Sequence, residues 1–143
     1  MNVTMLLADN AQEVGGKLYI LGGGWSVTGP NVPPMSIAIK VDVPWTEANK
    51  PHTWELVLTD ADGHPATFAV PDGEGEMRAS GEFEVGRPPG LTPGADIDLP
   101  IAINFGPLPL APGQRYSWQL WIDGETRSEW QRPFQVRATG VGT

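Results

Sequence analysis

The chain has 143 residues, of which 40% are hydrophobic and 18% charged, with no cysteine and a net charge of −8. This length suits one domain with a single packed core. The missing cysteines exclude disulfide scaffolds, thiolate zinc sites and cysteine nucleophiles. The negative charge argues against nucleic acid or an anionic membrane as a partner, because both require clustered Lys and Arg.

The N-terminal residues Met1 to Leu7 lack the basic and apolar regions of a secretory signal. No run of residues approaches the ~20 apolar residues that a membrane-spanning helix needs. The sequence therefore predicts a soluble, cytoplasmic protein, and it leaves a virion location open.

Strands are predicted along the whole chain, because apolar and polar residues alternate in one segment after another. The clearest case is Ser36–Val43, where every second residue is Ile or Val. In chain order the predicted strands are 3–11, 17–22, 36–43, 54–58, 79–85, 99–105, 116–122 and 134–138. The alternation is weaker in the first two segments and in the last one.

Glycine and proline pairs separate these segments and oppose long helices. Thr46–Asn49 is the only helical candidate, with Thr46 as the cap of a single turn. The pair Asp123-Gly124 predicts a type I′ turn that joins Arg115–Ile122 to a short strand at Thr126–Trp130. The Pro- and Gly-rich stretch Arg87–Ala95 fits either an arm across a neighbouring molecule or a surface loop.

The string Leu110-Ala-Pro-Gly-Gln-Arg-Tyr116 fits a tyrosine corner, in which a Tyr hydroxyl bonds to backbone a few residues upstream. With a strand count near eight, it predicts one all-β domain over residues 1–143. The predicted fold is an immunoglobulin-like antiparallel β-sandwich of about seven to nine strands with almost no helix. Residues 139–143 are predicted to form a flexible tail.

Catalytic groups are scarce in this sequence, and no enzyme activity is predicted. His52 and His64 are the only histidines, and both are predicted to lie in solvent. No G-x-S-x-G motif accompanies them. Gly22-Gly23-Gly24 lacks the other residues of a phosphate-binding loop, so a bulge or a close strand crossing explains the glycines better.

The acidic residues are concentrated between Asp42 and Asp98, a stretch that contains 12 acidic and 3 basic residues. Oxygen ligands for calcium are available from Asp60, Asp62 and the loop 72–76, but the EF-hand spacing is absent. No metal and no cofactor is predicted, and calcium binding by these acidic loops is left open. The pairs at 82/84 and 96/98 are i, i+2 neighbours on a strand, so they are predicted to face solvent.

The six tryptophans are the best clue to function. Trp54 and Trp118 have the phase of core residues, whereas Trp121 has the opposite phase. Exposed indoles anchor protein interfaces or stack on sugar rings. The predicted interaction surface comprises Trp121, Trp130, Trp45 and Trp25.

Four segments of the chain carry a resemblance to a known family: Thr4–Gln12, Gly16–Trp25, Gly81–Gly90 and Leu99–Phe105. Together they resemble a bacterial family of short all-β proteins of unknown function. The resemblance covers nearly the whole chain and implies a small domain with no assigned catalytic or ligand residue. The tyrosine-corner string is separately similar to immunoglobulin-like and fibronectin-like sandwiches, which concerns the fold alone.

These observations predict a non-enzymatic module that acts by surface contacts with a protein partner or with itself. A homo-oligomer fits this interpretation, and so does a structural or decoration subunit of a larger particle, cellular or viral. The alternative is a carbohydrate-binding β-sandwich that uses exposed tryptophans. A hydrolase with an acidic site is the least favoured hypothesis, because no two carboxylates are predicted to face each other across a cleft.

Overall fold

The computed structural model describes residues 1–140, which are all-β apart from one short 3-10 helix. Residues 141–143, part of the predicted tail, lie outside the described residues. The elements are β1 (Asn2–Val14), β2 (Lys17–Gly23), β3 (Val27–Thr28), β4 (Met35–Val43), η1 (Trp45–Glu47), β5 (His52–Thr59), β6 (Thr67–Val70), β7 (Gly73–Glu76), β8 (Arg78–Phe83), β9 (Ile97–Phe105), β10 (Arg115–Ile122) and β11 (Gln131–Val136).

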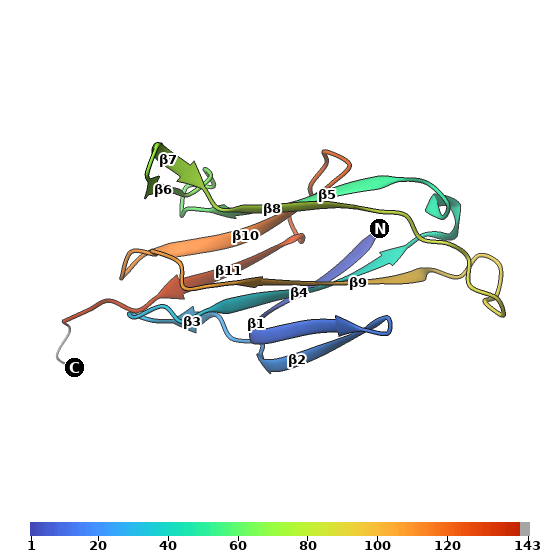
Figure 1. Cartoon of the computed structure of the whole chain (residues 1–143), viewed down its shortest axis with the longest axis horizontal. Helices are drawn as coiled ribbons and strands as arrows, with labels where there is room; N and C mark the ends of the chain where they lie inside the picture. The colour runs from blue at the N-terminus through green and yellow to red at the C-terminus, as the bar shows by residue number, and fades with distance from the viewer. Residues whose placement is uncertain (141–143) are drawn as a thin grey trace.

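Two large sheets make up most of the molecule (Figure 1). Sheet A has the strand order β2-β1-β4-β9, and sheet B has the order β3-β11-β10-β5-β8. All neighbouring strands in them are antiparallel except β3 and β11, which are parallel. Strands β6 and β7 form a separate hairpin.

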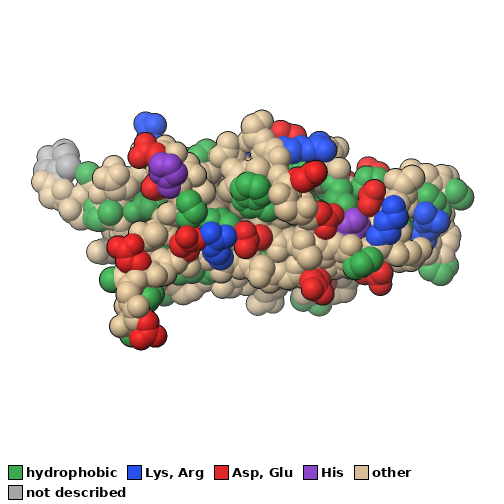
Figure 2. Space-filling model, turned by 90° about the horizontal axis from the view of Figure 1, so that it is seen from above, with side chains coloured by type: hydrophobic (Ala, Val, Ile, Leu, Met, Phe, Trp, Pro, Cys, Tyr) green, Lys and Arg blue, Asp and Glu red, His purple; other side chains and the backbone are tan. Residues whose placement is uncertain are grey.

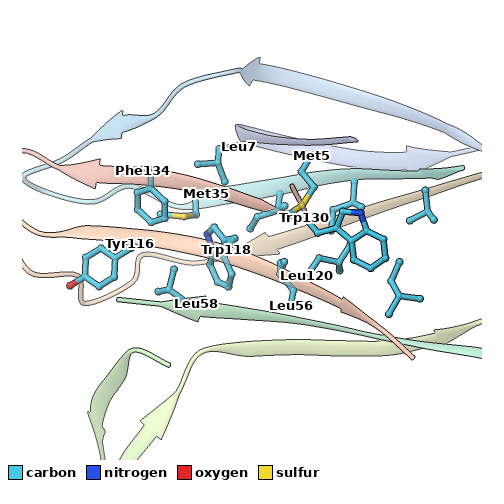
Figure 3. Close-up of a cluster of buried hydrophobic side chains, with 14 of the residues drawn as sticks. Met5, Leu7, Met35, Leu56, Leu58, Tyr116, Trp118, Leu120, Trp130 and Phe134 are labelled. Carbon is cyan, nitrogen blue, oxygen red and sulfur yellow. The ribbon is translucent and has the colours of Figure 1, made fainter. Parts of the chain in front are cut away.

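The core lies between the two sheets, as the labelled side chains of Figure 3 show. Ile37 and Ile39 of β4 point inward and are fully buried, as the alternation of Ser36–Val43 predicts. From sheet B, Leu56 and Trp118 meet them, and Trp118 stacks on Phe105 of β9 with 4.8 Å between ring centroids. Sheet A and sheet B are thereby joined through one continuous apolar layer.

Strand β1 is bent into two halves with different partners. Residues 2–8 pair with β4, and residues 8–14 pair with β2. Beyond Ala8 the β1–β2 hairpin doubles back across the outer face of sheet A (Figure 1). There the side chain of Asn104 on β9 donates to Ala11 O at 2.9 Å and accepts from Ala11 N at 3.4 Å. A single amide side chain thus pins the hairpin to the sheet.

The structure corrects two predictions of local structure. Thr126–Trp130 is not a strand, because β10 pairs instead with β11, and the turn keeps only a bridge between Ile122 and Glu125. Thr46 does not cap the helical turn, which follows Pro44 without a side-chain cap. Sheet A has four strands and sheet B has five, and the β6–β7 hairpin adds two more among the described residues. The positive φ angles of Asp123 (52°) and Gly124 (77°) match the predicted type I′ turn.

The tyrosine corner is present at the start of β10. Ala111 N donates to Tyr116 Oη at 3.0 Å, and the ring of Tyr116 stacks against Phe134. Tyr116 is 9% exposed, so its hydroxyl fixes the entry loop of β10 at the edge of the core.

We expect Tyr116→Phe to lower the free energy of unfolding by about 0.5–1.5 kcal/mol, because one hydrogen bond is lost while the ring stays buried. Urea unfolding followed by tryptophan emission measures this change. Tyr19, the only other tyrosine, is 57% exposed. Tyr19→Phe is therefore the matched control and leaves the midpoint unchanged; an equal effect of the two variants would refute a specific role for the corner.

Candidate functional site

The outer face of sheet B is hollowed around Trp121. Leu120 and Ile122 point into the core, so Trp121 between them points outward. The register places Glu55 of β5 beside Trp121, and Ser80 of β8 beside Glu55. Trp121 is half-buried, in agreement with the phase that the sequence assigns to it. We call this surface the Trp121 face; it comprises Thr53, Glu55, Val57, Arg78, Ser80, Glu82, Gln119 and Trp121.

Two hollows lie on this face, and Trp121 and Glu55 line both of them. The first has a volume of about 450 Å³ and is lined by Thr53, Trp54, Glu55, Ser80, Gly81, Glu82, Trp121 and Gly124. The second has a volume of about 350 Å³ and is lined by Glu55, Val57, Thr59, Gly63, Pro65, Arg78, Gln119, Trp121, Thr126 and Gln131. Both volumes lie in the range of small-ligand sites.

An ion-pair network borders the second hollow. Arg78 donates to Glu55 Oε1 at 3.0 Å and to Glu76 through two of its nitrogens. The hydrogen bond to Glu76 is the main cause that raises the pKa of Arg78 above its ordinary value. Figure 2 views the molecule from the side of β5 and β8, where acidic side chains are spread along its length with basic ones among them.

Gln119 is held rigidly between the second hollow and the loop that follows β10. Its Nε2 donates to Thr126 Oγ1 at 2.5 Å and to the carbonyl oxygens of Arg127 and Trp130, both at 3.2 Å. Thr126 in turn donates to Leu120 O at 2.7 Å. The amide is therefore oriented by the hydroxyl of Thr126 and by two backbone carbonyl groups.

The other three predicted interaction tryptophans are not on this face. Trp130 is only 5% exposed and belongs to the core, so the expectation that it is exposed is wrong. It is buried because the segment before β11 folds onto β10, where Leu120 N donates to Trp130 O. The four tryptophans therefore do not form one surface.

Trp45 and Trp25 are half-buried, each covered by neighbours. The guanidinium of Arg87 lies 4.4 Å from the ring centroid of Trp45, and Arg87 Nη2 donates to Trp45 O at 2.8 Å. This contact ties the start of the loop 87–95 to η1. Trp25 stands edge-on to Phe134, 6.0 Å between centroids, and its Nε1 is buried without a partner among the described residues.

The prediction that His52 lies in solvent is wrong, because this residue is 5% exposed and both of its ring nitrogens have hydrogen-bond partners. Its Nδ1 lies 2.7 Å from Asp123 Oδ2, its Nε2 lies 3.0 Å from Glu47 O, and its ring stacks on Phe83. Asp123 also accepts from Thr53 N at 2.9 Å. The partners are 71 and 5 residues away in sequence, and no local pattern announces this pairing.

The protonated form of His52 satisfies both of its acceptors. Burial lowers the pKa of His52, but the hydrogen bonds to Asp123 and Glu47 O outweigh it and raise the pKa above 6.5. Burial likewise raises the pKa of Asp123, and the hydrogen bonds from His52 and Thr53 N lower it overall, below 3.8. This arrangement is an ion pair that joins η1, β5 and the β10 turn.

The acidic loop residues are only partly brought together. Asp60, Asp62 and His64 each place a potential ligand atom within 4.8 Å of the others. Asp60 Oδ1, however, accepts the N–H groups of Asp62 and His64, as in an Asx turn. The predicted donors of the loop 72–76 do not join this cluster within residues 1–140. Glu82, Glu84, Asp96 and Asp98 are exposed, as predicted.

A second notable surface lies on the β1–β2 hairpin. Val14 and Tyr19 are each 57% exposed, Ile20 is 40% exposed and Leu21 is 71% exposed. Strand β2 pairs only with β1, so its other edge has no strand partner within residues 1–140. We call these four side chains, together with this edge, the β2 edge. The sequence analysis missed this surface, although three consecutive apolar residues on an outer strand mark it.

In the part of the chain that the structure describes, no helix has the length and apolar character that a membrane crossing requires. A comparison with protein families found one match, over residues 3–137, described as a family of unknown function (DUF6941). Comparison with curated proteins found no match, and comparison with solved structures found none either.

Proposed function

Because the chain belongs to DUF6941, a family of unknown function, we propose its role from its own surfaces: a non-enzymatic module that assembles with a protein partner through the β2 edge. The favoured partner is a second copy of the chain. The observation that carries this proposal is the exposure of large apolar side chains along a strand whose outer edge is unpaired within residues 1–140.

An unpaired apolar strand edge is a template for another strand. Natural sheets usually block such edges with charges, but Lys17 is the only charged residue of β2. In a two-fold pairing centred on Ile20, Tyr19 lies opposite Leu21 of the other copy, and Gly22, with a φ of 62°, ends the regular ladder. The same patch thus serves both copies, as an isologous interface requires.

The surroundings of His52 support a role without catalysis. Its two ring nitrogens are occupied by Asp123 and by Glu47 O. A triad needs one of these nitrogens to accept a proton from a nucleophile. His52 instead acts as a structural cation between two acceptors.

We also infer that the two sheets form an immunoglobulin-like sandwich. The order β1-β4-β9 opposite β3-β11-β10-β5-β8, with β3 parallel to β11, favours this topology. The tyrosine corner at Tyr116 supports it. Sandwiches of this kind serve many unrelated functions, so the topology adds nothing to the choice of partner.

The proposal predicts that the mass in solution rises with concentration from 15.4 kDa toward a discrete multiple. Light scattering after size exclusion measures it over a concentration series. Leu21→Lys places a charge on the β2 edge at a side chain that is 71% exposed, so the fold is kept while association weakens.

Val70→Lys is the matched control, because Val70 is 44% exposed on the separate β6–β7 hairpin. The control adds the same charge and leaves the mass unchanged. A wild-type chain that stays at 15.4 kDa throughout, or a Val70 variant that dissociates as fully as the Leu21 variant, would rule out self-assembly through the β2 edge.

A further inference from the structure

On the Trp121 face, the indole ring of Trp121 is accessible from two neighbouring hollows. The indole of Trp121 borders both hollows, and the backbone around it is fixed by pairing with β5. Aromatic rings in such positions bind the apolar face of a ligand with little loss of entropy. The family match covers these residues but assigns them no role, and the β2 edge lies on the other sheet.

The two hollows follow one another along β5. Thr53 lines the first hollow, Glu55 lines both, and Val57 and Thr59 line the second. These residues alternate along one face of the strand, so they span about 20 Å at ~3.3 Å per residue. An extended ligand lying along β5 would cross Trp121 beside Glu55, where the two hollows adjoin.

The polar groups of the face suit a ligand that carries many hydroxyls. The first hollow presents the hydroxyls of Thr53 and Ser80, and the second presents Gln119, whose Nε2 is already engaged. The Gln119 Oε1 thus remains as an acceptor in a fixed direction. Glu55 lines the same hollow, and its carboxylate is a second acceptor for the hydroxyls of a ligand.

The charges of the face disfavour an anionic ligand. Glu55 and Glu82 line the first hollow, which has no basic residue in its lining, so an anion is repelled there. Arg78 lines the second hollow together with Glu55, and its charge is already compensated by Glu55 at 3.0 Å and by Glu76. A neutral ligand meets no repulsion in either hollow.

We propose that the Trp121 face binds a neutral oligosaccharide of β-linked, gluco-configured rings that lies along β5. Such rings carry their hydroxyls at the rim and C–H groups on both faces, so one ring stacks on Trp121 while its rim reaches Glu55 and Gln119. The adjoining rings occupy the two hollows. The inference is independent of assembly through the β2 edge, which lies on sheet A.

The test is a titration of the full chain with cellotetraose, followed by amide chemical shifts and tryptophan emission. Cellotetraose is expected to shift the amides of β5, β8 and β10, and α-linked maltotetraose is expected to shift them far less. Trp121→Ala weakens binding about tenfold or more, and Trp121→Phe restores part of it, because a smaller aromatic wall remains. Trp45→Ala is the matched control and leaves binding unchanged.

Ser80→Arg is a second variant, because Ser80 is exposed and a long side chain there fills the first hollow without touching the core. It is expected to weaken cellotetraose binding even if Trp121→Ala fails to fold. Absence of shifts with cellotetraose overturns the proposal, as does unchanged binding in the Trp121 and Ser80 variants. Binding of tetra-arginine in place of the sugar, lost in Glu82→Gln, also overturns it and identifies a site for basic peptides.

Discussion

Trp118→Ala is expected to lower the free energy of unfolding by about 3–5 kcal/mol, the range for removing a large aromatic side chain from a core. Trp118 is 0% exposed and stacks on Phe105 at an interplanar angle of 14°. Its loss removes the aromatic stack that joins β10 of sheet B to β9 of sheet A. Since a domain is stable by only about 5–15 kcal/mol, the variant is expected to be marginal. The shift of the denaturant midpoint, at constant slope, measures the effect.

Trp118→Phe separates ring packing from the polar part of the indole. Trp118 Nε1 is buried with no hydrogen-bond partner among residues 1–140, so it is desolvated without compensation. Removing this N–H group offsets part of the cavity cost, and the Phe variant is expected to lose clearly less than the Ala variant. A loss below about 1 kcal/mol for Trp118→Ala would contradict the central place of this residue in the core.

Asp123→Asn is expected to destabilise the protein by about 1–2 kcal/mol near pH 5, because it removes the charged partner of His52. The value is at the lower end for charged hydrogen bonds, since the side chain of Asp123 is 46% exposed. Asn is the appropriate replacement because Asp123 has a φ of 52°, which Asn tolerates. Urea unfolding at several pH values measures the loss, and the C–H signals of His52 report its pKa.

The direction of the pH dependence follows from the two pKa shifts. The folded pKa of His52 is raised, so its stabilisation is complete below pH 6.5 and is lost as pH rises through the folded value. The folded pKa of Asp123 is lowered, so its stabilisation is present above pH 3.8 and is lost as pH falls through the folded value. The difference in the free energy of unfolding between wild type and Asp123→Asn is therefore largest between these limits and small at pH 9.

In Asp123→Asn the pKa of His52 is expected to fall, because burial remains while the hydrogen bond to a carboxylate is gone. If the difference in the free energy of unfolding between wild type and variant did not depend on pH, the pair would stabilise the protein only through packing and not through charge.

The two proposed surfaces are structurally separate, which makes their functions separable. The β2 edge belongs to sheet A, and the Trp121 face belongs to sheet B, on β5, β8 and β10. Leu21→Lys is therefore expected to leave cellotetraose binding intact, and Trp121→Ala is expected to leave the mass in solution unchanged.

The sequence by itself determined the elements whose pattern is local. In Ser36–Val43 and Tyr116–Ile122 every second residue is a large apolar one, and these side chains share a face because successive residues of a strand point to opposite sides. The same alternation assigned Trp118 to the core and Trp121 to the outside. The Asp123-Gly124 turn was also local, since both residues tolerate a positive φ.

Only the tertiary structure decided which distant groups meet. His52 is buried because Asp123 and Glu47 supply acceptors across strands, and nothing near His52 in sequence indicates them. Trp130 is buried because its segment folds onto β10, and the β1–β2 hairpin doubles back because Asn104 binds Ala11 across 93 residues. Local propensity acts over a few residues, whereas these contacts depend on the relative placement of whole strands, which is determined by the packing of the complete core.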